Sequence, residues 1–133
     1  MFRWYWKVVV WAVVVFTCSV IPGNEVGRFH LFNIPDLDKI IHFTLYLILG
    51  LLSIQAFKIQ DHSNTLRRYP ALFSFAFAMI YGGGLELLQE FAIVARSAQF
   101  SDMIANAFGL LTASFIIKLW FFHRVKLCNA SWT

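Results

Sequence analysis

The chain has 133 residues, of which 59% are hydrophobic and only 14% are charged, and its mean hydropathy is +0.67. Soluble domains carry about 25% charged residues, so this composition excludes an ordinary soluble domain and predicts a membrane protein. A net charge of +4 could favour nucleic acid, but the basic residues are scattered among apolar runs, so no nucleic-acid partner is predicted. No repeat or linker divides the chain, and residues 1–133 are predicted to form a single domain.

The first apolar run predicts a first membrane helix. It follows the aromatic cluster Trp4–Trp6, which can anchor at the membrane interface, and it ends before Pro22. With that anchor the run reaches the length of a membrane span. A signal peptide is the alternative, but no small-residue cleavage site precedes Pro22. Cys18 lies inside this run and Cys128 in the tail, so neither a disulfide nor a metal-ligand spacing is predicted.

An interfacial loop is predicted over residues 24–35, and it leads into a second helix that ends near Phe57. Asp36 or Asp38 is predicted to cap this helix, because a carboxylate accepts hydrogen bonds from the unpaired amides of the first turn. The polar residues at its start share an arc of roughly 100°. They are Asp38, Lys39, His42 and Tyr46. The second helix therefore carries a polar stripe at one end only.

A basic hydrophilic loop, residues 58–70, precedes a third helix that is predicted from about Ala71 to Phe91. The glycines Gly82–Gly84 are predicted to allow close helix contact in a membrane. The polar face of this helix spans roughly 100°. It consists of Gly82, Glu86, Gln89 and Glu90. This helix also carries its polar groups toward one end.

A fourth helix is predicted from Ser101, a candidate cap, to about Phe122, and the short basic tail after it is predicted to fray. One stripe of the fourth helix carries Asp102, Asn106 and Gly109. Residues 81–109 therefore form the polar apex of a helical hairpin between two apolar runs. The polar stripes are predicted to face each other rather than lipid, and ionisable groups at such positions are candidates for function.

Four helices place both termini on one side of the membrane, and the basic residues indicate which side. The side with the termini has Arg3, Lys7, Lys58, Arg67, Arg68, Lys118, Arg124 and Lys126, and the other has Arg28, Lys39 and Arg96. Since cytoplasmic loops are enriched in Lys and Arg, both termini are predicted to be cytoplasmic. The predicted fold is thus an all-α bundle of four transmembrane helices with its polar stripes on the outer side.

In the order and spacing of its polar residues, the chain resembles the VanZ-like family of small bacterial integral membrane proteins. The resemblance covers residues 36–113 and rests on Asp38, Lys39, His42, Phe43, Tyr46, Glu86, Gln89, Arg96, Ser101, Asp102, Asn106 and Gly109. It implies a multipass protein of the bacterial cytoplasmic (inner) membrane. The family's namesake is associated with lowered susceptibility to the glycopeptide teicoplanin. The resemblance does not imply a particular reaction.

The outer polar residues predict a site for an anionic molecule at headgroup level, such as a membrane lipid, a lipid-linked sugar or a cell-wall precursor. Arg96 can hold a phosphate or carboxylate with two hydrogen bonds, and Lys39 is the other cation near the stripes. The predicted ligand-binding residues are Lys39, Tyr46, Gln89, Arg96 and Asn106.

Whether the site is catalytic stays open. If it is, His42 is the candidate general base, oriented by Asp38 or Asp102, and Glu86 is the candidate acid. A metal is not predicted, because Lys39 among these residues would repel a cation, and no cofactor is predicted either.

Two other functions remain open. In the first, the charges pair with one another and the chain is a structural or partner-binding membrane subunit whose polar cluster only stabilises the bundle. In the second, the chain is a small transporter or channel, although four short helices offer little pathway.

Overall fold

The computed structural model describes residues 5–20, 37–92 and 100–130, and these residues are almost entirely helical, with no strand among them. The helices in chain order are α1 (Tyr5–Val20), α3 (Leu37–Ile59), α4 (Asn64–Arg68), α5 (Pro70–Ala92) and α6 (Phe100–Ala130). The prediction of an all-helical protein is confirmed for this part of the chain.

Three helices are long and apolar enough to cross a membrane. They are Leu37–Ile59 in α3, Pro70–Phe91 in α5 and Phe100–His123 in α6. α1 is also apolar but has 16 residues, which corresponds to about 24 Å and is shorter than a hydrocarbon core of about 30 Å. The chain is thus a membrane protein with three candidate spans, and α1 does not establish the predicted fourth. Residues 1–4 and the predicted interfacial loop 24–35 lie outside the described residues.

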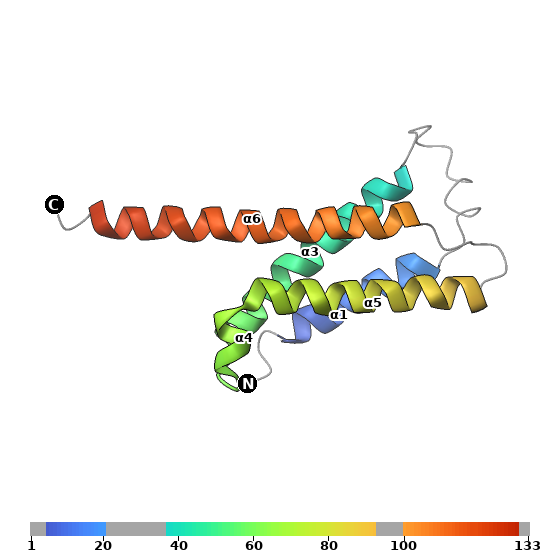
Figure 1. The fold of residues 1–133 in the computed structure, drawn as a ribbon, viewed down its shortest axis with the longest axis horizontal. Coiled ribbons are helices and arrows are strands. Elements are labelled where there is room, and N and C mark those ends of the chain that lie inside the picture. Colours follow the sequence, from blue (N-terminus) through green and yellow to red (C-terminus); the bar gives the residue numbers. More distant parts are fainter. Residues whose placement is uncertain (1–4, 21–36, 93–99, 131–133) are drawn as a thin grey trace.

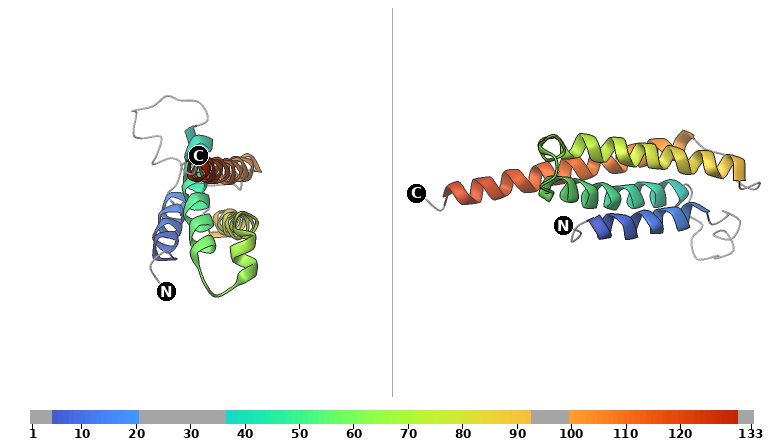
Figure 2. Two further views of the ribbon diagram at one scale, coloured as in Figure 1. Left: turned by 90° about the vertical axis from the view of Figure 1, so that its left-hand side faces the viewer. Right: turned by 90° about the horizontal axis from the view of Figure 1, so that it is seen from below.

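The four long helices alternate in direction, and α3 packs against α1, α5 and α6 (Figure 1). α1 and α5 end where α3 and α6 begin, at the right of Figure 1. We call this the His42 end of the bundle. α4, the first residues of α1 and the last residues of α6 lie toward the other end, the α4 end, where α6 projects beyond its neighbours (Figures 1 and 2).

α3 and α6 approach each other closely through small residues. A Cβ atom on Gly109 would collide with the carbonyl oxygen of Phe43 and would lie 2.9 Å from the backbone nitrogen of Leu47. A Cβ atom on Gly50 would lie 2.8 Å from Cβ of Ala113. The two backbones are therefore in contact, as small residues allow between membrane helices.

The three consecutive glycines of α5 do not act together as predicted. A Cβ atom on Gly82 would lie 2.6 Å from the hydroxyl oxygen of Tyr46, so this glycine makes room for α3. Cβ atoms on Gly83 and Gly84 would meet no described atom within 4 Å. The prediction of close contact is confirmed for Gly82 and wrong for its two neighbours, because they point away from α3.

The interior of the bundle holds many polar side chains, whereas its outer surface is apolar. The buried polar and charged residues are Ser19, His42, Ser53, Gln60, Ser74, Glu86, Gln89, Asp102 and Asn106. The large apolar residues exposed on α5 and α6 include Ile80, Phe91, Phe108, Leu111, Phe115 and Phe122. This distribution suits a protein surrounded by lipid, where apolar surface costs nothing and polar groups need partners inside.

Hydrogen bonds to backbone carbonyls attach α1 to the bundle. The indole nitrogen of Trp11 donates to the carbonyl of Leu45 in α3 at 2.9 Å. The hydroxyl of Tyr81 in α5 donates to the carbonyl of Ala12 at 2.7 Å. Toward the α4 end, the hydroxyls of Ser53 and Ser74 bond to each other and link α3 to α5. The helices are thus held by polar contacts as well as by packing.

Two predictions, one about the segment between α3 and α5 and one about the C-terminal tail, are wrong. The loop predicted over residues 58–70 contains the short helix α4, whose N-cap Ser63 accepts a hydrogen bond from the amide of Leu66 at 3.4 Å. The sequence predicts a frayed tail after Phe122, but α6 continues to Ala130. The helix has no reason to stop earlier, because residues 123–130 contain neither glycine nor proline.

The close approach of α3 and α6 predicts that Gly109→Ala lowers the free energy of unfolding by about 1–3 kcal/mol, because the added methyl group forces the two backbones apart. Denaturant titration in detergent measures this change. Gly84→Ala is the matched control, since its methyl group meets no described atom and alanine favours a helix by about 1 kcal/mol over glycine. Equal destabilisation by both substitutions would contradict the contact.

Candidate functional site

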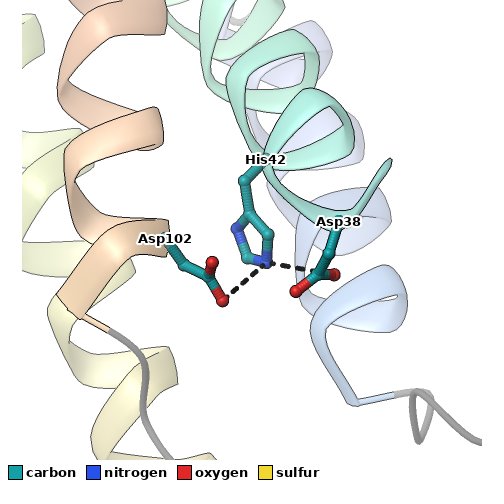
Figure 3. A group of neighbouring side chains, drawn as sticks. All are labelled: Asp38, His42 and Asp102. Carbon is teal, nitrogen blue, oxygen red and sulfur yellow. Dashed lines mark ion pairs between the residues drawn. The ribbon is translucent and has the colours of Figure 1, made fainter. Parts of the chain in front are cut away.

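The first turns of α3 and α6 bring four of the predicted site residues together at the His42 end. Asp38 and His42 are four residues apart in α3, as are Asp102 and Asn106 in α6, so each pair shares one face of its helix. Figure 3 shows the His42 ring between the two helices, with one edge toward both carboxylates. The predicted convergence of polar residues from separate helices is found for these four residues of α3 and α6.

The two ring nitrogens of His42 face different partners. Nδ1 lies 3.2 Å from Oδ1 of Asn106, and because an amide oxygen only accepts, Nδ1 carries the proton of that hydrogen bond. Nε2 lies 3.7 Å from Oδ2 of Asp102 and 4.0 Å from Oδ1 of Asp38. The last two distances suit ion pairs but are too long for hydrogen bonds.

Burial distinguishes the two carboxylates. Asp102 is 2% exposed, like Asn106, and His42 is 5% exposed, whereas the Asp38 side chain is 51% exposed. Burying an ionised carboxylate costs several kcal/mol unless positive charge and hydrogen bonds compensate. Ser101, which lies inside the first turn of α6 rather than capping it, donates to Oδ1 of Asp102 at 3.4 Å. Asp102 is therefore the enclosed acid of the site, and Asp38 forms its exposed edge.

α5 contributes Glu86 and Gln89, and both are buried. The side-chain nitrogen of Gln89 donates to the carbonyl of Ser19 in α1 at 2.6 Å. Its Oε1 is buried and has no hydrogen-bond partner among the described residues. Gln89 thus joins α5 to α1. The sequence does not predict this contact, because its partner is a backbone carbonyl, which every residue has.

The remaining predicted residues lie in different surroundings. Tyr46 is buried deeper in α3, against Gly82, where it packs α3 on α5. Lys39 is half-buried in the first turn of α3. Arg96, in the segment that joins α5 to α6, lies outside the described residues.

The geometry permits two kinds of chemistry at Nε2 of His42. With Nδ1 protonated, a neutral ring has its lone pair on Nε2, which makes this atom a base oriented by Asn106. Alternatively, Nε2 and one oxygen each from Asp38 and Asp102 lie within 4.8 Å of one another, close enough to share a cation. Both use the same side chains, and both place Asn106 in an orienting role.

Comparison of the chain with family models, with curated proteins and with solved structures finds no match.

The hydrogen bond between α3 and α6 predicts that Asn106→Leu lowers the free energy of unfolding by about 1–3 kcal/mol, because Nδ1 of His42 is left buried without its acceptor. Ser114→Ala in the same helix is the control. The Ser114 hydroxyl bonds to the carbonyl of Leu110 within α6, and its loss is expected to cost less than about 0.5 kcal/mol. Similar unfolding midpoints for the two variants in detergent would contradict the role of Asn106.

Proposed function

We propose that the chain is a VanZ-like integral membrane protein of the bacterial envelope whose polar site at the His42 end binds the anionic headgroup of a lipid or of a lipid-linked cell-wall precursor. The observation that carries this proposal is the convergence of buried His42, Asp102 and Asn106 at one end of a bundle that is apolar outside. Polar and ionisable groups are costly at membrane depth, so their concentration at one spot favours a function.

The exposed edge of the site supports access from the membrane surface. Asp38 begins the site with its side chain half exposed, and His42 and Asp102 follow with almost no exposure. A headgroup that approaches the first turn of α3 would therefore reach the exposed Asp38 first and the buried His42 and Asp102 after it. Arg96 and Lys39 are assigned from the sequence as the cations that attract its negative charge.

The basic residues support an orientation in which the His42 end faces outward. Lys58 and Lys118 line a cavity of about 360 Å³ between α3, α5 and α6 toward the α4 end, and Arg67 and Arg68 lie in α4. Lysine and arginine favour the cytoplasmic face and its anionic lipids. In the proposed topology α1 is the fourth span, both termini are cytoplasmic, and the membrane is the bacterial inner membrane.

A more specific version of this proposal is that the site also catalyses a chemical modification of the bound headgroup. Nε2 of His42 would act as the base, with Asp102 stabilising the ring once it is protonated, and Glu86 would supply an acid. Lowered susceptibility to teicoplanin would follow where the bound or modified molecule is the antibiotic's cell-wall target.

The competing proposal is a structural subunit, and two contacts favour it. The His42–Asn106 hydrogen bond joins α3 to α6, and the Gln89–Ser19 hydrogen bond joins α5 to α1. Against it, the close backbone contact at Gly109 already joins α3 to α6 without charged groups. A scaffold needs no enclosed carboxylate, because such a group costs more than it contributes unless it is well paired.

The orientation predicts opposite labelling of two exposed acidic positions. Asp61 lies at the α4 end and Glu90 near the end of α5 at the His42 end. With Cys18 and Cys128 replaced by serine, a membrane-impermeant maleimide added to intact cells is expected to label Glu90→Cys and to reach Asp61→Cys only after lysis. The reverse pattern would invert the proposed topology.

Ligand binding predicts that an anionic lipid travels with the protein in mild detergent and that His42→Ala reduces its occupancy at least tenfold, because the site loses its central ring. Native mass spectrometry followed by lipid extraction measures this. Ser53→Ala is the matched control, since it also removes a buried hydrogen-bonding group from α3, toward the other end. Equal lipid occupancy in both variants and in Arg96→Ala would favour the scaffold instead.

A further inference from the structure

Three donor atoms from α3 and α6 converge at the His42 end (Figure 3). They are Nε2 of His42 and one carboxylate oxygen each of Asp38 and Asp102, all within 4.8 Å of one another. We propose that these atoms bind one divalent metal ion of the zinc type, with a further coordination position open to a phosphate oxygen. The metal site stands on this geometry alone, whereas the phosphate rests on the proposed function.

The tautomer of His42 favours a cation at this point. Because Nδ1 donates its proton to Asn106, a neutral ring directs the Nε2 lone pair toward Oδ2 of Asp102 and Oδ1 of Asp38. A lone pair facing two negative oxygens is repulsive, and a cation bound between them turns this repulsion into attraction. A proton on Nε2 would not form a good hydrogen bond to either oxygen, since both distances exceed the usual range. A metal ion accepts all three donors at once.

The groups around the donors are arranged as metal sites require. A ligating histidine usually donates its other ring N–H to an oxygen, which fixes the ring and the tautomer. The buried amide of Asn106 does this for His42. The hydroxyl of Ser101 donates to Oδ1 of Asp102, which leaves Oδ2 as the atom that faces His42. Both enclosed donors are thus oriented from behind.

The three donor atoms lie within 4.8 Å of one another and must move closer together to hold zinc. Donors bound at about 2.0–2.1 Å in a tetrahedral site are roughly 3.3 Å apart, and the distances from Nε2 are 3.7 Å to Asp102 and 4.0 Å to Asp38. The longer distance involves the half-exposed side chain, which closes it by a side-chain rotation. The enclosed pair moves by only a few tenths of an ångström.

The donor set selects the class of metal. One imidazole with two carboxylates suits zinc and similar transition ions, whereas calcium and magnesium prefer sites made of oxygen atoms alone. Three protein ligands with an open position are typical of zinc that acts on a bound molecule. The open position would lie toward the exposed side of Asp38, where a headgroup phosphate enters.

The sequence disfavours a metal because of Lys39, which is half-buried in the first turn of α3. Adjacent residues of a helix are about 100° apart, so Lys39 leaves α3 about 100° from Asp38 and about 60° from His42. The carboxylates of Asp38 and Asp102 together balance the charge of a divalent ion, so a lysine beside the three donors does not exclude the metal.

The test is zinc binding by the full chain in detergent, purified without a histidine tag. Cys18 and Cys128 are replaced by serine, because thiolates also bind zinc. After treatment with a chelator and reloading with zinc alone, elemental analysis is expected to find one zinc per chain. Cobalt substitution is expected to give the visible absorption of a tetrahedral ion. Binding of less than a tenth of an equivalent would overturn the proposal.

The variants distinguish this site from adventitious binding. Asp38→Asn, His42→Ala and Asp102→Asn are each expected to weaken zinc binding at least tenfold, and Asn106→Ala is expected to weaken it about 10–100-fold by releasing the ring. Asp61→Asn and His62→Ala are the controls, because both residues are exposed at the α4 end. Asp38→Asn changes a half-exposed side chain, so it keeps the test valid if a buried variant does not fold. Unchanged affinity in Asp38→Asn would reject the site.

Zinc and lipid are measured on the same preparations, so the two proposals fail separately. One zinc per chain without an anionic lipid upholds the metal site and contradicts the proposed function. Zinc binding of less than a tenth of an equivalent with anionic lipid at wild-type occupancy contradicts the metal site and leaves the proposed function intact. One zinc per chain with lipid occupancy that is unchanged in the zinc-free protein overturns the phosphate position on the metal.

Discussion

The contact between the backbones of α3 and α6 at Gly109 determines the arrangement of the His42 end. Gly109 lies against Phe43, the residue that follows His42, and it shares its stripe of α6 with Asn106 and Asp102. Once this glycine fixes the distance and the register of the two helices, the histidine ring can reach the amide of Asn106 and face the carboxylate of Asp102. A side chain at position 109 would move all of these groups apart together. The polar site therefore depends on a close contact between two backbones that involves no polar side chain.

In contrast to a soluble protein, the bundle has apolar side chains on its surface and many polar side chains inside. This distribution explains why hydrogen bonds join its helices. With lipid outside, packing of apolar side chains between helices gains little, so association depends on close backbone approach and hydrogen bonds. The indole of Trp11, the hydroxyl of Tyr81 and the amide of Gln89 all bond to backbone carbonyls of neighbouring helices. These contacts hold α1 in place although it is shorter than the other long helices. The carboxylates of Asp38 and Asp102 are thus additional to these hydrogen bonds between helices.

Helical periodicity is sufficient to predict the all-α fold and the two stripes that meet in the site, because residues four apart must share a helix face. The pairing of His42 with Asn106 and its approach to Asp102 follow from those stripes once α3 lies against α6. Periodicity does not predict the Gln89–Ser19 bond, because any exposed carbonyl in any register could serve as the acceptor. It also cannot tell Gly82, which faces Tyr46, from Gly83 and Gly84, since that difference depends on the rotation of α5 against α3. Periodicity also misses α4, because this short helix begins at a single N-cap serine within a basic, hydrophilic segment whose composition is typical of a loop.

An acidic site that binds an anion contains a conflict of charge, and its resolution connects the two proposals. Asp38, Asp102 and Glu86 gather toward the same end of the bundle, where an anionic headgroup would be repelled if these groups were ionised and unneutralised. Lys39 and Arg96, the cations assigned to the site from the sequence, would attract a headgroup, and the enclosed carboxylate of Asp102 also needs compensating charge. A divalent ion between His42 and the two aspartates would do both, because it neutralises the carboxylates at short range in a low dielectric and still offers positive charge to a phosphate. Metal occupancy and headgroup affinity should then rise and fall together, a linkage that a purely structural role for the same residues does not require.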